Sequence, residues 1–221
     1  MSDPRRWSAV VVYAIAMALL EAAVVTYLRT LIGRTDPYHP VPLPVPAWLM
    51  KIELAREAAT LVMLAAVAWL AGRERRARLG YFLIAFGVWD IFYYVFLVPM
   101  TGWPRSPFDW DVLFLIPLPW WGPVLAPVSI AALMVAGGTL ASQFTRSGRA
   151  LWPRGGPLAA GMAGVLLALY AFMADALRAP HWSAQALASL LPTKFDWPLF
   201  GLALALMCVP LADQLRQLRR R

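Results

Sequence analysis

Six blocks of apolar residues, each long enough to cross a lipid bilayer, limit most strongly how this chain can fold. About 20 consecutive apolar residues span a hydrocarbon core roughly 30 Å thick. Of the 221 residues, 61% are hydrophobic and 14% are charged, whereas soluble domains carry about 25% charged residues. The blocks are Trp7–Thr30, Ile52–Ala71, Gly80–Met100, Pro119–Ala141, Pro157–Leu177 and Trp197–Leu215. We therefore expect an all-α integral membrane protein, a compact six-helix transmembrane bundle that forms a single domain over residues 1–221.

Basic residues are distributed unevenly between the two sides of this six-span arrangement. Thirteen of the 20 basic residues fall at the termini and in the second and fourth connections, all on one side. They are Arg5, Arg6, Arg73, Arg75, Arg76, Arg78, Arg146, Arg149, Arg154, Arg216, Arg219, Arg220 and Arg221. Because basic residues accumulate in cytoplasmic loops, we expect both termini in the cytoplasm (N-in, C-in) of a multi-pass inner-membrane protein. This one-sided distribution explains the net charge of +8 by the orientation of the chain in the lipid bilayer. We therefore expect the bilayer, and no nucleic acid, as a partner.

Two acidic residues interrupt the apolar blocks, Glu21 in the first and Asp90 in the third. Glu21 lies about 18–20 Å from the cytoplasmic start of its span, and Asp90 lies about 15 Å from the start of its own. A carboxylate at this depth costs several kcal/mol unless it is neutral, paired or hydrated, so it indicates a functional site by default. We therefore predict that Glu21 and Asp90 carry the chemistry of the protein.

The distribution of all the acidic residues predicts a cavity around these two. Nine of the 12 acidic residues fall in the outer half of the bundle or outside it. They are Glu21, Asp36, Glu53, Glu57, Asp90, Asp109, Asp111, Asp175 and Asp196. We expect a cavity that opens to the outside, with Glu21 and Asp90 at its floor and with Arg56, Glu57 and Asp175 at its mouth. A buried acid in such a cavity can hold or deliver a proton.

Aromatic residues near Asp90 predict what the cavity accepts. Tyr93 and Tyr94 follow Asp90 by three and four residues, so they lie on the same helix face. A phenol can donate a hydrogen bond to a buried carboxylate and so lower the cost of its burial. Together with Trp89 and Trp120, these tyrosines are expected to form an aromatic wall for a small cation or a lipid-like ligand.

Local spacing predicts further contacts within and between the spans. A separation of three residues allows an ion pair between Glu53 and Arg56, and another between Asp175 and Arg178. The small residues at 160–164 permit a neighbouring helix to approach the fifth span closely.

Three segments between the spans carry their own signals. Proline at every second position over 40–46 predicts an extended connection, because proline fixes φ and disfavours helix in the preceding residue. The prolines of Pro117–Pro127 indicate a re-entrant or broken segment before the fourth span. An amphipathic stretch over 183–191 is expected to lie in the membrane interface.

Several kinds of chemistry lack the residues that they need. Neither histidine falls within a span, so a bis-histidine haem is excluded, and two scattered histidines with the lone Cys208 make a weak zinc site. The pair Arg56–Glu57 begins the Arg-Glu-x-x-Glu pattern of iron permeases, but Thr60 stands in place of the second glutamate. We therefore expect no cofactor. Metal binding stays open for four residues of the outer loops, Asp109, Asp111, His39 and His181.

The segment Trp89-Asp90-Ile-Phe-Tyr93 resembles the Trp-Glu-aromatic segment of small integral-membrane terpene cyclases, in which an intramembrane acid protonates a polyprenyl substrate. The resemblance covers about a dozen residues and places aspartate where that family has glutamate. It implies an isoprenoid or other lipid substrate, with Asp90 as the general acid.

These observations leave three functional classes open, and whether the chain is an enzyme is left undecided. The first is a protein that binds or transports a cation or a small amphipathic ligand with proton coupling. The second is a membrane-embedded enzyme that acts on a lipid or isoprenoid with Asp90 as general acid. The third is a non-catalytic subunit or assembly factor of a larger membrane complex. A carrier with so few spans is also expected to form a homo-oligomer.

Overall fold

The computed structural model describes residues 4–34, 36–38, 47–146, 149–178 and 194–219. Within these ranges, six helices are long and apolar enough to cross a membrane, so the chain is a multi-pass membrane protein built from α-helices. They are α1 (Pro4–Leu31), α2 (Ala47–Ala71), α3 (Arg75–Thr101), α4 (Leu125–Gln143), α5 (Gly155–Arg178) and α7 (Trp197–Arg219). Two short antiparallel pairs complete the described part, β1 (Trp110–Phe114) with β2 (Trp120–Pro123) and β3 (Thr145–Arg146) with β4 (Arg149–Ala150).

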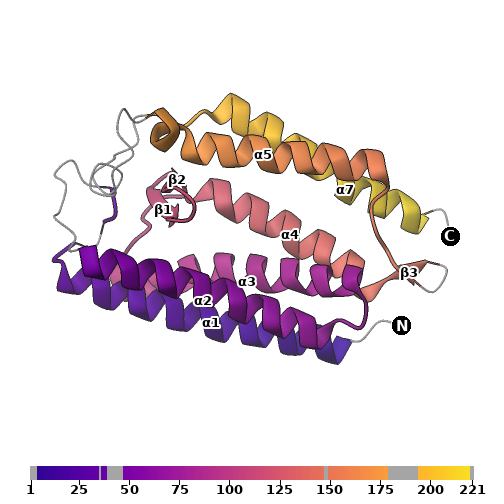
Figure 1. The fold of residues 1–221 in the computed structure, drawn as a ribbon, viewed down its shortest axis with the longest axis horizontal. Coiled ribbons are helices and arrows are strands. Elements are labelled where there is room, and N and C mark those ends of the chain that lie inside the picture. The colour runs from indigo at the N-terminus through magenta and orange to yellow at the C-terminus, as the bar shows by residue number, and fades with distance from the viewer. Residues whose placement is uncertain (1–3, 35, 39–46, 147–148, 179–193, 220–221) are drawn as a thin grey trace.

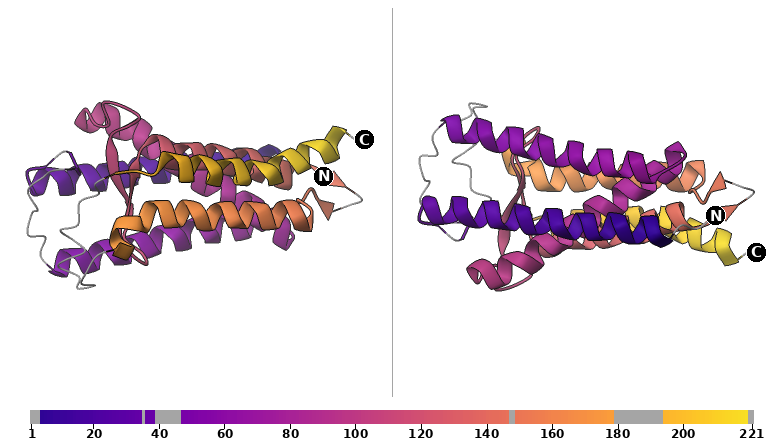
Figure 2. Two further views of the ribbon diagram at one scale, coloured as in Figure 1. Left: turned by 90° about the horizontal axis from the view of Figure 1, so that it is seen from above. Right: turned by 90° about the horizontal axis from the view of Figure 1, so that it is seen from below.

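The helices lie along one long axis in three layers (Figures 1 and 2). Helix α3 packs on α1, α2 and α4, while α5 packs on α7, and α4 also contacts α7. Helix α1 begins, and helix α7 ends, at the same end of the bundle (Figure 1). The β1–β2 hairpin lies toward the opposite end. We call these the terminal end and the hairpin end.

Glycines set the close approach of α3 to α4. A Cβ atom at Gly87 would lie 2.5 Å from the carbonyl oxygen of Ala131, and one at Gly138 would lie 2.5 Å from that of Gly80. Small residues therefore allow the two backbones to touch, as is common between helices in membranes.

Glycines also allow α5 and α7 to pack closely, as the small residues at 160–164 predict. A Cβ atom at Gly164 would lie 2.6 Å from the carbonyl oxygen of Ala203, and one at Gly161 would lie 2.5 Å from the ring of Pro210. The predicted close helix contact of the fifth span is thus confirmed.

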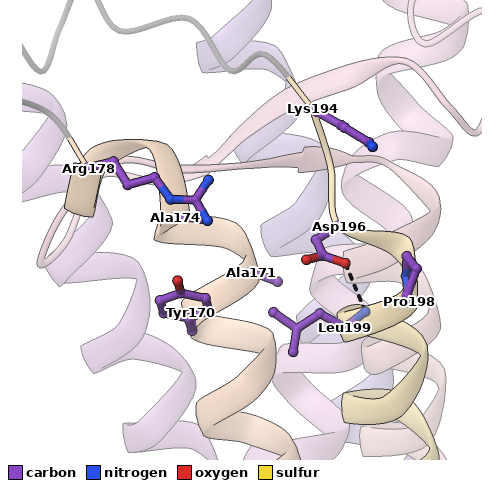
Figure 3. A pocket seen from close by; sticks show the side chains of 8 residues that line it. All are labelled: Tyr170, Ala171, Ala174, Arg178, Lys194, Asp196, Pro198 and Leu199. Atoms are coloured by element: carbon purple, nitrogen blue, oxygen red, sulfur yellow. Dashed lines mark hydrogen bonds between the residues drawn. The ribbon is translucent and has the colours of Figure 1, made fainter.

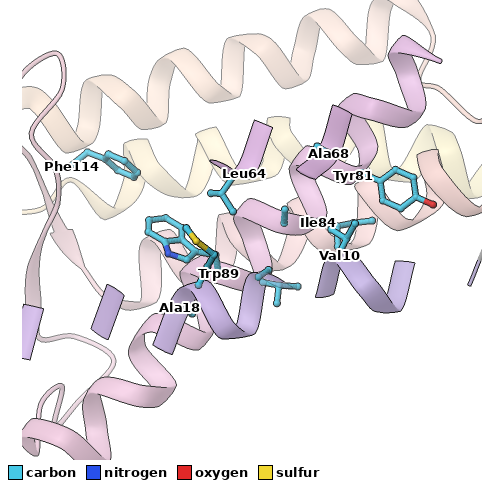
Figure 4. Close-up of a cluster of buried hydrophobic side chains, with 12 residues drawn as sticks. Val10, Ala18, Leu64, Ala68, Tyr81, Ile84, Trp89 and Phe114 are labelled. Carbon is cyan, nitrogen blue, oxygen red and sulfur yellow. The ribbon is translucent and has the colours of Figure 1, made fainter. Parts of the chain in front are cut away.

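The largest buried apolar cluster joins the first three helices to the hairpin (Figure 4). Alanines of α1 give α3 room to approach, and the larger side chains fill the space between the helices. Members from each element include Val10 and Ala18 of α1, Leu64 and Ala68 of α2, Tyr81, Ile84 and Trp89 of α3, and Phe114 of β1. Because Phe114 belongs to this cluster, the hairpin is part of the core.

The fourth span begins later than predicted. Its apolar block starts at Pro119, but 120–123 form strand β2 and the helix begins at Leu125. Pro127 is tolerated because it lies in the first helical turn, where its missing N–H leaves no hydrogen bond unmade. The expected break before this span is thus a β-hairpin, whose paired strands satisfy most of their backbone groups.

Two predicted segments, the proline-rich connection over 40–46 and the amphipathic stretch over 183–191, lie outside the described residues. The same holds for His39 and His181.

Candidate functional site

Charged and phenolic side chains gather where α1, α2 and α3 meet the hairpin, in the half of the bundle toward the hairpin end. We call this set the polar layer. Its members are Glu21, Arg29, Glu53, Arg56, Glu57, Asp90, Tyr93, Tyr94 and Asp111. Four of its five acids are held by specific partners, and these are described first.

Arg56 joins α2 to α1. Its guanidinium forms an ion pair with Glu21 of α1, and its Nη2 lies 2.7 Å from Oε2 of Glu53, one turn earlier on α2. The Thr60 hydroxyl donates to Glu21 Oε2 at 3.4 Å. The predicted pair of Glu53 with Arg56 is therefore confirmed. Glu21, expected at the floor of the cavity, is paired with Arg56, expected at its mouth.

Glu57 lies next on α2 and contacts the hairpin instead of another helix. The backbone N–H of Leu115, just after β1, donates to both of its carboxylate oxygens, at 3.0 and 3.1 Å. The N–H of Ile116 donates as well. Since an unpaired backbone N–H inside a bundle is costly, Glu57 stabilises the point at which the chain leaves β1.

A second ion pair fixes the hairpin to α1. Nη2 of Arg29 lies 3.1 Å from Oδ1 of Asp111, and the two side chains are only 9% and 2% exposed. The same oxygen accepts the N–H of Val112 at 2.9 Å, and the Tyr94 hydroxyl donates to the carboxylate. The guanidinium also lies 4.3 Å above the ring of Trp103. No local spacing in the sequence predicts this pair, whose members are 82 residues apart.

Burial raises the pKa of Asp111 to about 6, because a charged carboxylate loses its hydration there. Three contacts act in the opposite direction, the charge of Arg29 and the hydrogen bonds from Tyr94 and the Val112 N–H. Burial outweighs these contacts, so the carboxyl group binds its proton more tightly than an exposed aspartate.

Asp90 differs from the other acids of the polar layer. It is partly buried, and it forms no hydrogen bond or ion pair with any residue that the structure describes. It lies within one helical turn of Gly87, which touches α4, and of the buried Tyr94. Asp111 is close enough to interact with it electrostatically. The carboxylate thus interacts with Asp111 and with the phenols of Tyr93 and Tyr94, and it has no cation of its own among the described residues.

Tyr93 is close to both ion-paired arginines, Arg56 with its two glutamates and Arg29 with Asp111. Its phenol interacts electrostatically with Asp111, Arg29, Arg56 and Asp90. The centroid of its ring lies 5.0 Å from that of Tyr94. Both tyrosines interact electrostatically with Asp90. Neither donates the expected hydrogen bond to its carboxylate, and the Tyr94 hydroxyl donates to Asp111 instead.

The two tryptophans of the predicted aromatic wall gather around a third ring. The ring centroids of Trp89 and Trp120 lie 6.3 and 5.3 Å from that of Phe114, and Trp120 also stacks on Phe172 of α5 at 6.3 Å. The indole N–H of each tryptophan is buried and lacks a hydrogen-bond partner among the described residues. Because Trp89 and Asp90 are consecutive in a helix, their side chains point about 100° apart.

Asp175 is separated from this site. It belongs to α5, which packs on α7 and β2, whereas Arg56 and Glu57 belong to α2, which packs on α1 and α3. Within the described part of the chain, Asp175 forms no ion pair with Arg178. The structure therefore brings together Glu21 with Arg56, and Asp90 with the two tyrosines, but it does not bring Asp175 to either.

Metal ligands were left open by the sequence. Among the residues that the structure describes, no three histidine, cysteine, aspartate or glutamate side chains lie close enough to hold a metal ion. Asp109 caps its own loop, since its Oδ2 accepts the N–H groups of Arg105 and Ser106 at 2.7 and 3.2 Å.

Comparison with known proteins adds no assignment. The chain matches no protein-family model, no curated protein and no solved structure.

Proposed function

We propose that this multi-pass membrane protein binds a small cation in its polar layer, with Asp90 as the acceptor group and with a proton as the competing occupant. The single observation that carries this proposal is the unpartnered carboxylate of Asp90 inside a bundle of apolar helices. An unpaired ionised group in such surroundings is costly, so it takes up either a proton or a cation.

The charge balance of the polar layer supports this proposal. The layer contains five carboxylates and only two guanidinium groups, those of Arg29 and Arg56, which leaves a formal charge of −3 when every group is ionised. Leaving a buried charge without its partner costs about 3–5 kcal/mol. A cation bound at Asp90 would offset part of this excess, and so would protonation of the same carboxyl group. The two events would therefore exclude each other, which is the basis of proton coupling.

The residues beside Asp90 favour an organic or monovalent cation. The ring of Tyr93 is only partly buried and packs beside the buried Tyr94, and aromatic faces attract ammonium groups. A divalent metal ion would require additional carboxylate or imidazole ligands, and no such group of three lies together in the described ranges. A lipid-like amine would match both the aromatic faces and the single carboxylate.

The binding test compares wild type with Asp90→Asn. The purified protein is titrated with tetramethylammonium and with sodium while its thermal unfolding is followed, because a ligand that binds the folded state stabilises it by about 2.7 kcal/mol at 100 times its Kd. We expect a cation-dependent rise of the unfolding temperature in wild type and none in Asp90→Asn. The control Asp109→Asn removes a loop carboxylate outside the polar layer and should respond like wild type.

Two results would oppose the proposal: an equal response of Asp90→Asn and wild type, or no response of wild type to either cation. Loss of folded protein in Asp90→Asn, with a well-folded Asp90→Glu that ignores both cations, would instead favour a purely structural role for this group.

A second candidate function is a lipid-modifying enzyme, favoured by the aromatic rings around Phe114. Carbocations derived from isoprenoids are stabilised by aromatic faces, and Trp89 and Trp120 both contact this ring. In this reaction the Asp90 carboxyl would donate its proton to an alkene carbon, and loss of a proton from the resulting cation would restore the acid. The product would be an isomer of the substrate. Incubation with polyprenyl diphosphates and alcohols, followed by mass spectrometry and chromatography, would detect such an isomer.

We also propose the cell membrane as location, with both termini in the cytoplasm. The bias of basic residues supports this orientation. The start of α1 and the end of α7 lie at the same end of the bundle, which is compatible with it (Figure 1). Accessibility of terminal tags to protease in intact cells tests the orientation, and digestion of both tags from outside would reverse it.

A further inference from the structure

A cavity of about 220 Å³ lies between α5 and α7 at the hairpin end, apart from the polar layer. Its walls combine apolar groups, such as Ala171 and Leu199, with the polar side chains of Tyr170, Arg178 and Lys194. Figure 3 shows the guanidinium of Arg178 reaching from the end of α5 toward the start of α7. A binding site with two cations and an apolar base suits an anionic group that is attached to something apolar.

The charge of the cavity selects the kind of anion. Arg178 and Lys194 are exposed and form no ion pair within the described part of the chain. Asp196 also lines the cavity, but its Oδ1 accepts the N–H of Leu199 at 3.0 Å, as a cap of α7. Two cations and one carboxylate leave a formal charge of +1, which matches a single negative charge.

The position of the cavity selects the source of the anion. Arg178 ends one candidate membrane span and Trp197 begins another, so the cavity lies at the boundary between the apolar bundle and water. Trp197 is 37% exposed, and tryptophan is enriched at this boundary in membrane proteins. Phospholipid phosphates occupy the same level of the bilayer, with their acyl chains directed toward the apolar part of the helices.

We propose that this cavity binds a phosphate monoanion, supplied by the headgroup of a membrane phospholipid. Arg178 contacts the phosphate oxygens, Lys194 supplies a second positive charge at the rim of the cavity, the Tyr170 hydroxyl offers a further hydrogen bond, and the apolar base accepts the glycerol carbons. Free phosphate shares the chemistry of the headgroup, and the experiment below separates the two sources.

The test is native mass spectrometry of the full chain in detergent, with three probes: phosphatidylglycerol, diacylglycerol with the same chains, and inorganic phosphate. We expect one phosphatidylglycerol to be retained more tightly than diacylglycerol. A basic residue near an anionic lipid contributes about 1 kcal/mol, so Arg178→Gln and Lys194→Gln should each weaken retention about fivefold. Lys51→Gln is the matched control, because Lys51 is an exposed cation near the hairpin end of α2 and does not line the cavity.

The unfolding temperature of each variant checks that it folds, and these exposed substitutions should leave it unchanged. Displacement of the lipid by millimolar inorganic phosphate would support the phosphate site while identifying free phosphate as a competing source. Equal retention of phosphatidylglycerol and diacylglycerol would overturn the proposal. The proposal would also be overturned if Arg178→Gln and Lys194→Gln both retained phosphatidylglycerol as tightly as wild type.

Discussion

The packing of α4 against α3, which fixes the face that carries Asp90, can be tested with two adjacent glycines. In Gly138→Ala the new Cβ would lie 2.5 Å from the carbonyl oxygen of Gly80 and 3.1 Å from Cγ1 of Ile84. In Gly137→Ala it would lie 3.6 Å from Oε1 of Gln214, an ordinary contact. The first substitution must therefore push the helices apart, and the second need not.

The expected difference follows from two terms. Alanine is favoured over glycine inside a helix by about 1 kcal/mol, and this gain is the same at both positions, so it cancels in the comparison. Overpacking a tight contact costs about 1–3 kcal/mol. We therefore expect the free energy of unfolding of Gly138→Ala to be lower than that of Gly137→Ala by about 1–3 kcal/mol.

The assay is unfolding of the purified protein by sodium dodecyl sulfate in mixed micelles, followed by the fluorescence of its 11 tryptophans. Each variant is compared with wild type under the same detergent conditions. Equal stability of the two variants, or a Gly138→Ala protein more stable than Gly137→Ala, would refute the close α3–α4 contact.

Two further predictions concern the ion pairs of the polar layer. Arg56→Gln leaves the carboxylates of Glu21 and Glu53 without their cation, and because these side chains are 12% and 17% exposed, we expect unfolding to become easier by about 2–4 kcal/mol in the same assay. For Asp111 the pKa of about 6 lies above the usual 3.8, so its contribution to stability is fully present below pH 4 and is lost as the pH rises through 6. Asp111→Asn, which keeps an oxygen near Arg29, should remove this slope of up to about 1.4 kcal/mol per pH unit, and an unchanged pH profile would contradict the assignment.

The sequence predicts most features that depend on local spacing, although the three-residue spacing of Asp175 and Arg178 gives no ion pair within the described residues. Block length predicts the six spans because each must cross the same thickness of lipid, and a separation of three residues predicts the contact of Glu53 with Arg56. The small residues at 160–164 predict that another helix packs closely on α5, because their short side chains leave the backbone of α5 accessible.

Contacts between distant segments could not be read from the sequence in the same way. Arg29 and Asp111 are 82 residues apart, and Glu21 meets Arg56 across two helices, so no local spacing indicates either pair. The basic character of Arg29 at the end of an apolar block was the available signal, since such a group requires an acid or water nearby.

The β1–β2 hairpin was missed for a related reason. Its strands, Trp110–Phe114 and Trp120–Pro123, lie in an almost continuous apolar stretch, where a buried strand and a buried helix have the same periodicity. Only the prolines at 117 and 119 marked the interruption. The structure shows that this hairpin determines the surroundings of both Glu57 and Asp111.

Exchange of a proton for a cation at Asp90 can be measured by counting the protons released as a cation binds. Isothermal titration with tetramethylammonium or sodium, in two buffers of different ionisation enthalpy between pH 5 and 8, gives this number. We predict that wild type releases up to one proton per bound cation toward the acidic end of this range, and that Asp90→Asn releases none. Cation binding by wild type without proton release at any pH, or equal release by the variant, would contradict the claim.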